Sequence, residues 1–249
     1  MEKPANGQLR GCVALVTGAS RGVGARIAVL LGGEGASVAV NYRNKERRAE
    51  EVAAEVRAVG GAALCVQADV TDSEQSRALF EAIREQFSRL DLLILNASGG
   101  LEKEMPADYA MRLNRDAQLS LLDLALPIMP VGSRVVFVTS HMAHFHGRQP
   151  GLDVYEPVAV SKRAGEDALR GRIVELTKVG VTLVVVSGDL IDGTTTPKLM
   201  QRQRPGIIDA RRAQAGSLPT IDDFARAIVA AAANPALASG DTVYVGSTD

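Results

Sequence analysis

Short apolar runs alternate with helical stretches along most of the 249-residue chain. The runs are rich in Val, Leu and Ala and are continuous rather than alternating, which is typical of strands covered by helices on both faces. This alternation predicts an α/β fold with a doubly wound, parallel, seven-stranded sheet. The expected strands are residues 12–17, 37–41, 63–68, 90–96, 134–139, 181–187 and 242–245.

The segments between the apolar runs have the periodicity and the end signals of helices. Ser73 and Thr220 are expected N-caps, and Gly60 and Gly180 follow helix ends, where glycine adopts a left-handed turn easily. Because parallel crossovers are right-handed, the loops that follow the strands meet at one edge of the sheet, where ligands bind. The expected helices are residues 22–31, 45–59, 73–87, 106–126, 157–177 and 221–233.

Charge and composition narrow the class of partner. The net charge is -1, with Lys and Arg spread along the chain, so we expect no nucleic acid as a partner. No apolar run approaches the roughly 20 residues that a membrane helix needs, and residues 1–10 resemble a flexible polar leader rather than a signal peptide. Cys12 and Cys65 lack the spacing of a metal site. We therefore expect a single cytoplasmic domain over residues 11–249, with no membrane segment and no metal.

A glycine-rich turn joins the first expected strand to the first expected helix. Residues 17–24 read Thr-Gly-Ala-Ser-Arg-Gly-Val-Gly, which places Gly18, Gly22 and Gly24 between a strand and a helix. Glycines at such a junction let the backbone turn tightly and approach a pyrophosphate at the helix N-terminus. The junction therefore predicts a nucleotide site.

Four segments, in the same chain order, resemble the short-chain dehydrogenase/reductase family. They are the glycine turn, the pair Asp69 and Val70 after the third strand, the stretch Asn-Ala-Ser-Gly at residues 96–99, and Asn114 in the following helix. The resemblance implies a Rossmann-type fold, a nicotinamide cofactor, and a proton-relay water organised by Asn114. The cofactor contacts that it implies are Gly18, Ser20, Arg21, Gly22, Val23, Gly24, Asp69, Val70, Asn96, Ala97, Ser98, Lys162, Gly188, Ile191 and Thr194.

The residues after the second strand indicate which nicotinamide cofactor is preferred. An acidic residue there would accept a hydrogen bond from the ribose 2′-hydroxyl and would repel a 2′-phosphate. This chain instead has Asn-Tyr-Arg-Asn at residues 41–44, and Arg21 lies in the glycine turn. Arginine suits phosphate because its planar fork gives two charge-assisted hydrogen bonds. We therefore expect NADP(H) bound by Arg21, Arg43 and Asn44, although both arginines could also be solvated surface charges.

The expected catalytic site departs from the family pattern at one position. The resemblance assigns carbonyl positioning to Ser140 and ribose binding to Lys162, but the family tyrosine four residues before the lysine is replaced by Val158. Tyr155 is the nearest phenol, and on a helix it lies on nearly the same face one turn earlier. Pro157 indicates that Tyr155 precedes the helix, so we predict Tyr155 as a displaced proton donor, with packing or substrate contact as the alternative.

All three histidines of the chain lie in the loop that follows Ser140. Because imidazole in general titrates near neutrality, one of His141, His144 and His146 could donate the proton instead of Tyr155. The alternatives are a substrate-lining position, a solvated position, or a metal site.

The sequence leaves more than one function open. The first hypothesis is an NADPH-dependent reductase of a small ketone, or the reverse alcohol oxidation, with residues 194–215 as a substrate lid. The second is an NADP(H)-binding sensor or scaffold that has lost redox turnover, which Val158 favours. The third is a lyase or dehydratase on the same fold. The resemblance also implies a homotetramer or a homodimer.

Overall fold

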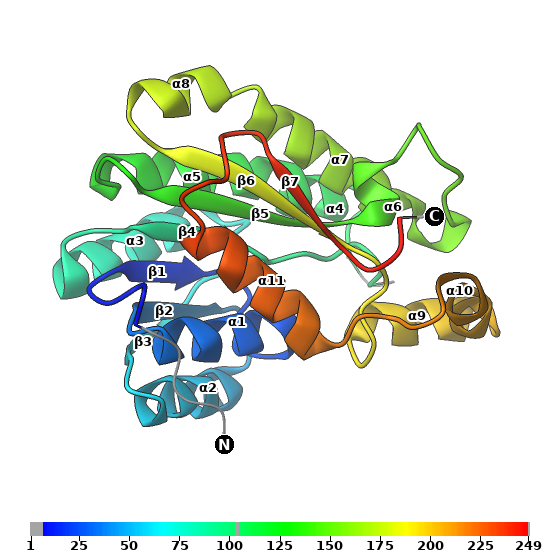
Figure 1. Ribbon diagram of the computed structural model, residues 1–249, viewed down its shortest axis with the longest axis horizontal. Coiled ribbons are helices and arrows are strands. Elements are labelled where there is room, and N and C mark those ends of the chain that lie inside the picture. The colour runs from blue at the N-terminus through cyan, green and yellow to red at the C-terminus, as the bar shows by residue number, and fades with distance from the viewer. Residues whose placement is uncertain (1–6, 103–104, 249) are drawn as a thin grey trace.

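A single parallel sheet of seven strands organises the computed structural model, which describes residues 7–102 and 105–248 (Figure 1). The strand order is β3-β2-β1-β4-β5-β6-β7, and every neighbouring pair is parallel. This confirms the predicted doubly wound α/β fold. The strands are β1 (Val13–Val16), β2 (Ser37–Tyr42), β3 (Ala62–Gln67), β4 (Leu92–Leu95), β5 (Arg134–Ser140), β6 (Thr182–Gly188) and β7 (Thr242–Val245).

Helices cover both faces of the sheet (Figure 1). One layer contains α1 (Gly22–Gly33), α2 (Glu46–Ala58) and α11 (Ile221–Ala233). The opposite layer contains α3 (Ser73–Phe87), α5 (Ala117–Ala125), α7 (Glu156–Arg170) and α8 (Ile173–Lys178). None of the described helices is long and apolar enough to cross a membrane.

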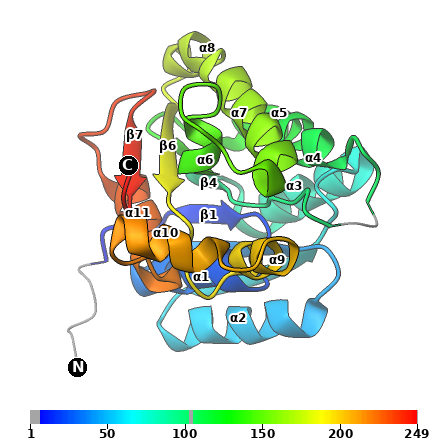
Figure 2. The ribbon, with the colours of Figure 1, turned by 90° about the vertical axis from the view of Figure 1, so that its right-hand side faces the viewer.

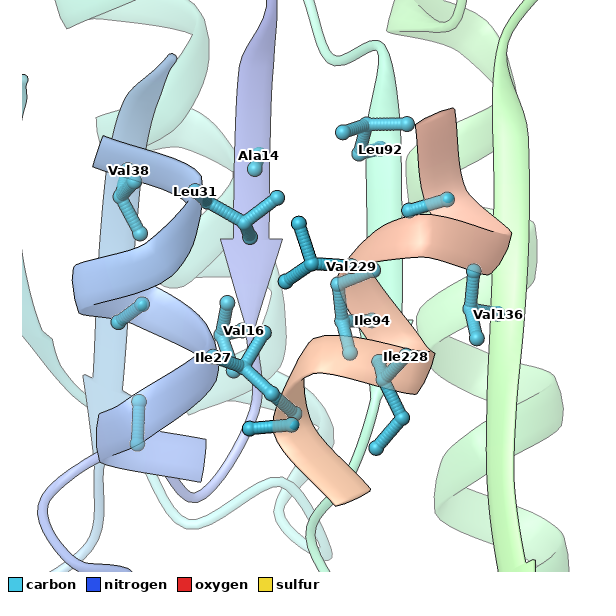
Figure 3. Close-up of a cluster of buried hydrophobic side chains, with 14 of the residues drawn as sticks. Ala14, Val16, Ile27, Leu31, Val38, Leu92, Ile94, Val136, Ile228 and Val229 are labelled. Atoms are coloured by element: carbon cyan, nitrogen blue, oxygen red, sulfur yellow. The ribbon is translucent and has the colours of Figure 1, made fainter. Parts of the chain in front are cut away.

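The buried cores explain why the strand residues are almost continuously apolar. In the layer of α1 and α11, Ile27 and Ile228 pack against Val16 and Ile94 from the centre of the sheet (Figure 3). Leu15, the neighbour of Val16, belongs to the core on the opposite face. Burying apolar side chains on both faces stabilises the sheet by about 25 cal/mol for each Å² removed from water, and it fixes the positions of the loops at the strand ends.

Two predicted long helices are interrupted in the structure. The expected helix at 106–126 consists of α4 (Tyr109–Met111), a π-helical turn (Arg112–Asp116) and α5. The expected helix at 157–177 is divided at Gly171 into α7 and α8. Helical periodicity continues through both interruptions, so the pattern did not reveal them. π-turns of this kind are frequent at functional sites.

The helix ends follow the predicted signals with one exception. Thr220 caps α11 in a capping box with Asp223, and Gly60 and Gly180 follow helices at positive φ. The N-cap of α3 is Asp72 rather than Ser73, because the Asp72 carboxylate accepts hydrogen bonds from the first free backbone N–H groups. A negative charge at a helix N-terminus is also favoured by the helix dipole.

Two segments at the chain periphery are more ordered than their composition indicated. In the expected leader, residues 1–6 lie outside the described residues, whereas Leu9 is buried and its N–H donates to the Glu34 carbonyl at 3.2 Å. Residues 194–215 form α9 (Thr195–Gln203) and α10 (Ile207–Ala215). Figure 2 looks onto the edge of the molecule where these two helices lie.

Candidate active site

A cleft of about 650 Å³ lies at the carboxyl edge of the sheet, lined by the loops that follow the strands. The structure brings most of the predicted site residues together in this cleft. Asn114 and Gly188 are the two predicted site residues that do not line it. The predicted residues that do are Gly18, Ser20, Arg21, Gly22, Val23, Gly24, Arg43, Asn44, Asp69, Val70, Asn96, Ala97, Ser98, Ser140, Tyr155, Lys162, Ile191 and Thr194.

The glycine turn leaves room for a ligand where side chains would block it. Gly22 has φ +58°, and a Cβ at this position would meet no atom within 4 Å, so its surface faces open space in the cleft. Gly24 is required by packing instead, because a Cβ there would lie 2.6 Å from the Asn96 Nδ2 atom and the Gly18 carbonyl oxygen. The bare backbone at the start of α1 therefore fits a pyrophosphate group.

Three polar side chains hold this turn in place. The Asn41 Oδ1 atom accepts from the Gly18 N–H at 3.2 Å, and Asn96 Nδ2 donates to the Thr17 carbonyl at 2.9 Å. Thr17 Oγ1 in turn accepts from the N–H groups of Asn96 and Ala97. Sequence reasoning missed the supporting roles of Thr17 and Asn41. The available signal was a buried polar residue at the carboxyl end of an apolar strand.

Four cationic side chains from the segments that follow β1 and β2 line the cleft. Arg21 and Arg43, both predicted, line it together with Lys45 and Arg48 at the start of α2. Lys45 and Arg48 were not predicted as site residues, although both follow Arg43 within five positions. Arg43 also approaches Asp69 at 3.9 Å. Four cations in this position fit an additional phosphate group.

Ser140, Tyr155 and Lys162 all line the cleft. Ser140 ends β5, and Tyr155 ends a 3-10 turn (Asp153–Tyr155) immediately before α7, as Pro157 had indicated. The Ser140 Oγ and Tyr155 Oη atoms are 3.1 Å apart. Burial raises the pKa of Tyr155, which keeps the phenol protonated at neutral pH, and the hydrogen bond with Ser140 opposes this shift.

Lys162 is a buried cation that lines the same cleft as these hydroxyl groups. Its side chain lines the cleft from α7. Burial lowers its pKa to about 8, and the negative charge of Glu166, one helical turn later, opposes that shift. Glu166 is fully buried and accepts hydrogen bonds from His144 and Arg170. Lys162 therefore combines a positive charge with poor access to water.

Asn114 lies behind the cleft rather than in it. Its Nδ2 atom donates to the Gly99 carbonyl and to Ser161 Oγ, at 2.9 Å each. Its backbone carbonyl faces Gly165 of α7, where a Cβ would lie only 2.0 Å away. The π-turn and the bare surface of Gly165 thus allow the Asn114 backbone to approach the helix that carries Lys162.

The geometry agrees with the sequence comparisons. Residues 12–204 match the family described as short chain dehydrogenase. This chain belongs to the short-chain dehydrogenase/reductase family. A hydroxynaphthalene reductase of Aspergillus fumigatus is 34% identical over 187 residues, which is 72% of this chain and 66% of the relative. The matches span 36–68% of the length of the curated relatives.

Solved structures share the fold over nearly their whole length. A short-chain dehydrogenase from Burkholderia cenocepacia in complex with NADP has a TM-score of 0.81 at 29% identity, covering 96% of this chain and 97% of its own. The angucycline C-6 ketoreductase LanV with bound NADP has a TM-score of 0.79 at 29% identity, covering 97% and 96%.

Residue 158 of this short-chain dehydrogenase/reductase is part of a buried apolar cluster. Val158 is 3% exposed and belongs to a buried cluster with Tyr155, Leu190 and Met200. Its Cγ2 atom would lie 3.2 Å from a Cβ at Gly100. The Val158 side chain therefore packs in this buried cluster. The phenol that approaches Ser140 belongs to Tyr155, three positions earlier in the chain.

The histidines of this family member lie outside the cleft. The interpretation of His141 and His144 as substrate-lining or solvated groups is wrong, because both are buried on α6 (His141–His144). His141 Nδ1 is 2.8 Å from Ser187 Oγ, and His144 Nε2 is 2.9 Å from the Tyr244 hydroxyl. His146 Nε2 pairs with Glu156 at 2.9 Å. Within the described residues, no three His, Cys, Asp or Glu side chains group as metal ligands.

Gly188 and the residue after it serve the packing of the cleft wall. A Cβ on Gly188 would lie 2.7 Å from the Phe224 ring of α11, so glycine is needed for close packing at this position. Asp189 is buried and lines the cleft, and its carboxylate pairs with Arg211 of α10 at 2.9 Å. This ion pair connects the end of β6 to the helices at 195–215.

Proposed function

We propose that this protein is an NADP(H)-dependent oxidoreductase that reduces a small ketone to an alcohol, or catalyses the reverse reaction. The observation that carries the proposal is the 3.1 Å contact between Ser140 Oγ and Tyr155 Oη in a cleft that buried Lys162 also lines. NADP(H), when bound, supplies or accepts the hydride. Relatives whose names describe a hydroxynaphthalene reductase and a ketoreductase support the carbonyl substrate.

The cofactor binds along the part of the cleft that begins at the glycine turn. The exposed backbone at Gly22 accommodates the pyrophosphate. Arg43, with the nearby Arg21, Lys45 and Arg48, attracts the 2′-phosphate that distinguishes NADP(H) from NAD(H). The remaining predicted contacts, Ser20, Val23, Gly24, Asn44, Asp69, Val70, Asn96, Ala97, Ser98, Ile191 and Thr194, line the same cleft.

Proton transfer is the task of the three central residues. Ser140 and Tyr155 donate hydrogen bonds to the carbonyl oxygen, and Tyr155 then gives its proton to the alkoxide that hydride addition produces. A protonated phenol is required for this step, which agrees with the raised pKa of buried Tyr155. The positive charge of Lys162 stabilises the phenolate that remains, and its position in the cleft suits a contact with the cofactor ribose.

The sensor hypothesis was based on Val158. The contact of Tyr155 with Ser140 supports the enzyme instead, because a pure binding protein does not need a phenol beside this serine. The lyase hypothesis has no feature of the cleft in its favour. The dimeric or tetrameric state and the cytoplasmic location stay sequence-based predictions.

Turnover of NADPH with a panel of ketones and quinones tests the proposal. We expect loss of NADPH absorbance with the wild-type protein. The variant Tyr155→Phe should lower kcat by about 100- to 10,000-fold, the usual contribution of a proton donor, while leaving NADPH affinity within about threefold. His146→Ala is the matched control, because this half-exposed side chain lies outside the cleft.

Two outcomes would contradict the proposal. Tight NADPH binding without turnover of any carbonyl compound would favour the sensor. Full turnover by Tyr155→Phe would exclude Tyr155 as the proton donor.

A further inference from the structure

A hydrogen bond joins Arg43 and Tyr109, two residues of the cleft lining. Arg43 follows β2, whereas Tyr109 begins α4, and the two lie 66 positions apart in the sequence. Arg43 Nη1 donates to the Tyr109 hydroxyl oxygen at 2.6 Å, and the guanidinium carbon lies 5.8 Å from the centre of the ring. Both residues line the cleft.

The two partners differ in their freedom to move. The Arg43 side chain is 40% exposed, and a long exposed side chain loses rotamer entropy when a ligand fixes it. Tyr109 is 6% exposed and packs in the same core as Leu113 and Ala117. The Arg43 carbonyl also accepts from Gln67 Nε2 at 2.9 Å. The arginine is thus held at its backbone by one partner and at its guanidinium by a rigid phenol.

The phenol orients the guanidinium without neutralising it. Burial raises the pKa of Tyr109, so its hydroxyl is an uncharged acceptor at neutral pH. The carboxylate of Asp69 lies farther away, 3.9 Å from the same Nη1 atom. Among the described residues, the Nε and Nη2 atoms of Arg43 have no hydrogen-bond partner. The Nε and Nη2 atoms of the Arg43 guanidinium are therefore available to donate hydrogen bonds to an anion.

We propose that Tyr109 is a positioning residue that gives the protein its preference for NADP(H), because it holds Arg43 ready for the 2′-phosphate. This inference rests on the proposed function, since it requires a dinucleotide in the cleft. Removal of the hydroxyl leaves the charge of Arg43 intact but frees its rotamers. The resulting loss of affinity falls on ligands that carry a 2′-phosphate and spares ligands without one.

Calorimetric titration of the full-length protein with two small probes tests this inference independently of turnover. The probes are adenosine 2′,5′-bisphosphate and adenosine 5′-monophosphate, which differ in the 2′-phosphate. We expect Tyr109→Phe to weaken binding of the bisphosphate about tenfold, in line with one hydrogen bond to a charged group. Binding of the monophosphate should change less than about twofold. Tyr42→Phe is the matched control, because Tyr42 is equally buried but does not line the cleft.

A double substitution separates positioning of Arg43 from direct contact with the ligand. In an Arg43→Ala background, Tyr109→Phe should cause no further loss of bisphosphate affinity, since there is no guanidinium left to position. Melting temperatures of all variants verify that they are folded.

The outcomes distinguish this inference from the proposed function. If wild type binds the bisphosphate no better than the monophosphate, the NADP(H) preference itself fails, and the role of Tyr109 with it. If wild type prefers the bisphosphate and Tyr109→Phe keeps that preference, only the role of Tyr109 is overturned. Equal losses for both probes would also overturn it, because they would indicate a purely structural effect.

Discussion

Lys162 is a charged residue that the fold holds at a cost to stability. Burial lowers its pKa from 10.5 to about 8, so between these pH values the unfolded chain binds more protons than the folded protein. Stability therefore rises with pH across this window, and below about pH 8 the folded state bears the full cost of the buried ammonium. Natural proteins accept such costs at functional sites.

We expect the Lys162→Met variant to be inactive but more stable than wild type by about 1–3 kcal/mol at pH 7. The methionine side chain has a similar volume to lysine, and the substitution removes the buried charge. The difference should shrink as pH rises from 8 toward 10. Urea unfolding of both proteins across this range measures it, with the exposed Lys178→Met as control. A stability difference that is independent of pH would show that the charge of Lys162 is not the cause.

At the residue scale, the sequence predicted side chains whose chemistry is local and missed those whose partners are distant. The glycine turn and Ser140 were predictable because their neighbours in the chain place them at a strand end. Tyr109 was not, because its partner Arg43 is separated from it by 66 residues. The roles of His141 and His144 depend on Ser187 and Tyr244, which lie 46 and 100 positions away in the sequence.

At the element scale, the segment that the sequence predicted as a substrate lid contains the helices α9 and α10. Pro197 is the third residue of α9, within the first turn, where the helix tolerates proline, and Pro205 falls between the two helices. Neither proline therefore breaks a helix. α10 is tied to the cleft wall, because Arg211 pairs with buried Asp189 and donates to the Ser247 carbonyl at 2.9 Å.

We expect Arg211→Ala to loosen α9 and α10, because it leaves the buried carboxylate of Asp189 without a charge partner, which costs about 3–5 kcal/mol in proteins. KM for the carbonyl substrate should rise about tenfold, and limited proteolysis should cut within 195–215 faster. The matched control is Arg212→Ala, whose partners Asp192 and Asp209 are exposed and contribute little. Equal effects of the two substitutions would contradict a specific role for the Arg211 ion pair.

For the whole molecule, burial on both faces of the sheet explains why the fold was more predictable than the site. Seven strands that are apolar on both faces need helices on both sides of the sheet to bury their side chains. The structure contains these strands in one parallel sheet. The parallel order then brings the ends of β1, β2, β4, β5 and β6 to one edge, which is where the cleft lies. The hydrophobic pattern of the sequence could not predict which side chains from different loops contact one another at that edge.

The same architecture couples cofactor binding to the stability of the whole chain. Because the cleft is built from loops between most of the strands, a ligand that fills it binds the folded state and not the unfolded one. At 100 times its Kd, such a ligand stabilises a protein by about 2.7 kcal/mol, which raises the melting temperature of a domain of this size by about 5–10 °C. We expect NADPH to produce this increase and NADH at the same concentration to produce a clearly smaller one.

Scanning fluorimetry with both cofactors measures these shifts in melting temperature, and the Arg43→Ala variant is the control. This variant should reduce the shift caused by NADPH toward the shift caused by NADH. Its melting temperature without ligand should be nearly that of wild type. The arginine is half-exposed, and its loss removes little buried surface. Equal shifts for NADPH and NADH in wild type would mean that the cations around Arg43 do not read the 2′-phosphate. No shift with either cofactor would mean that the cleft at the carboxyl edge is not a dinucleotide site.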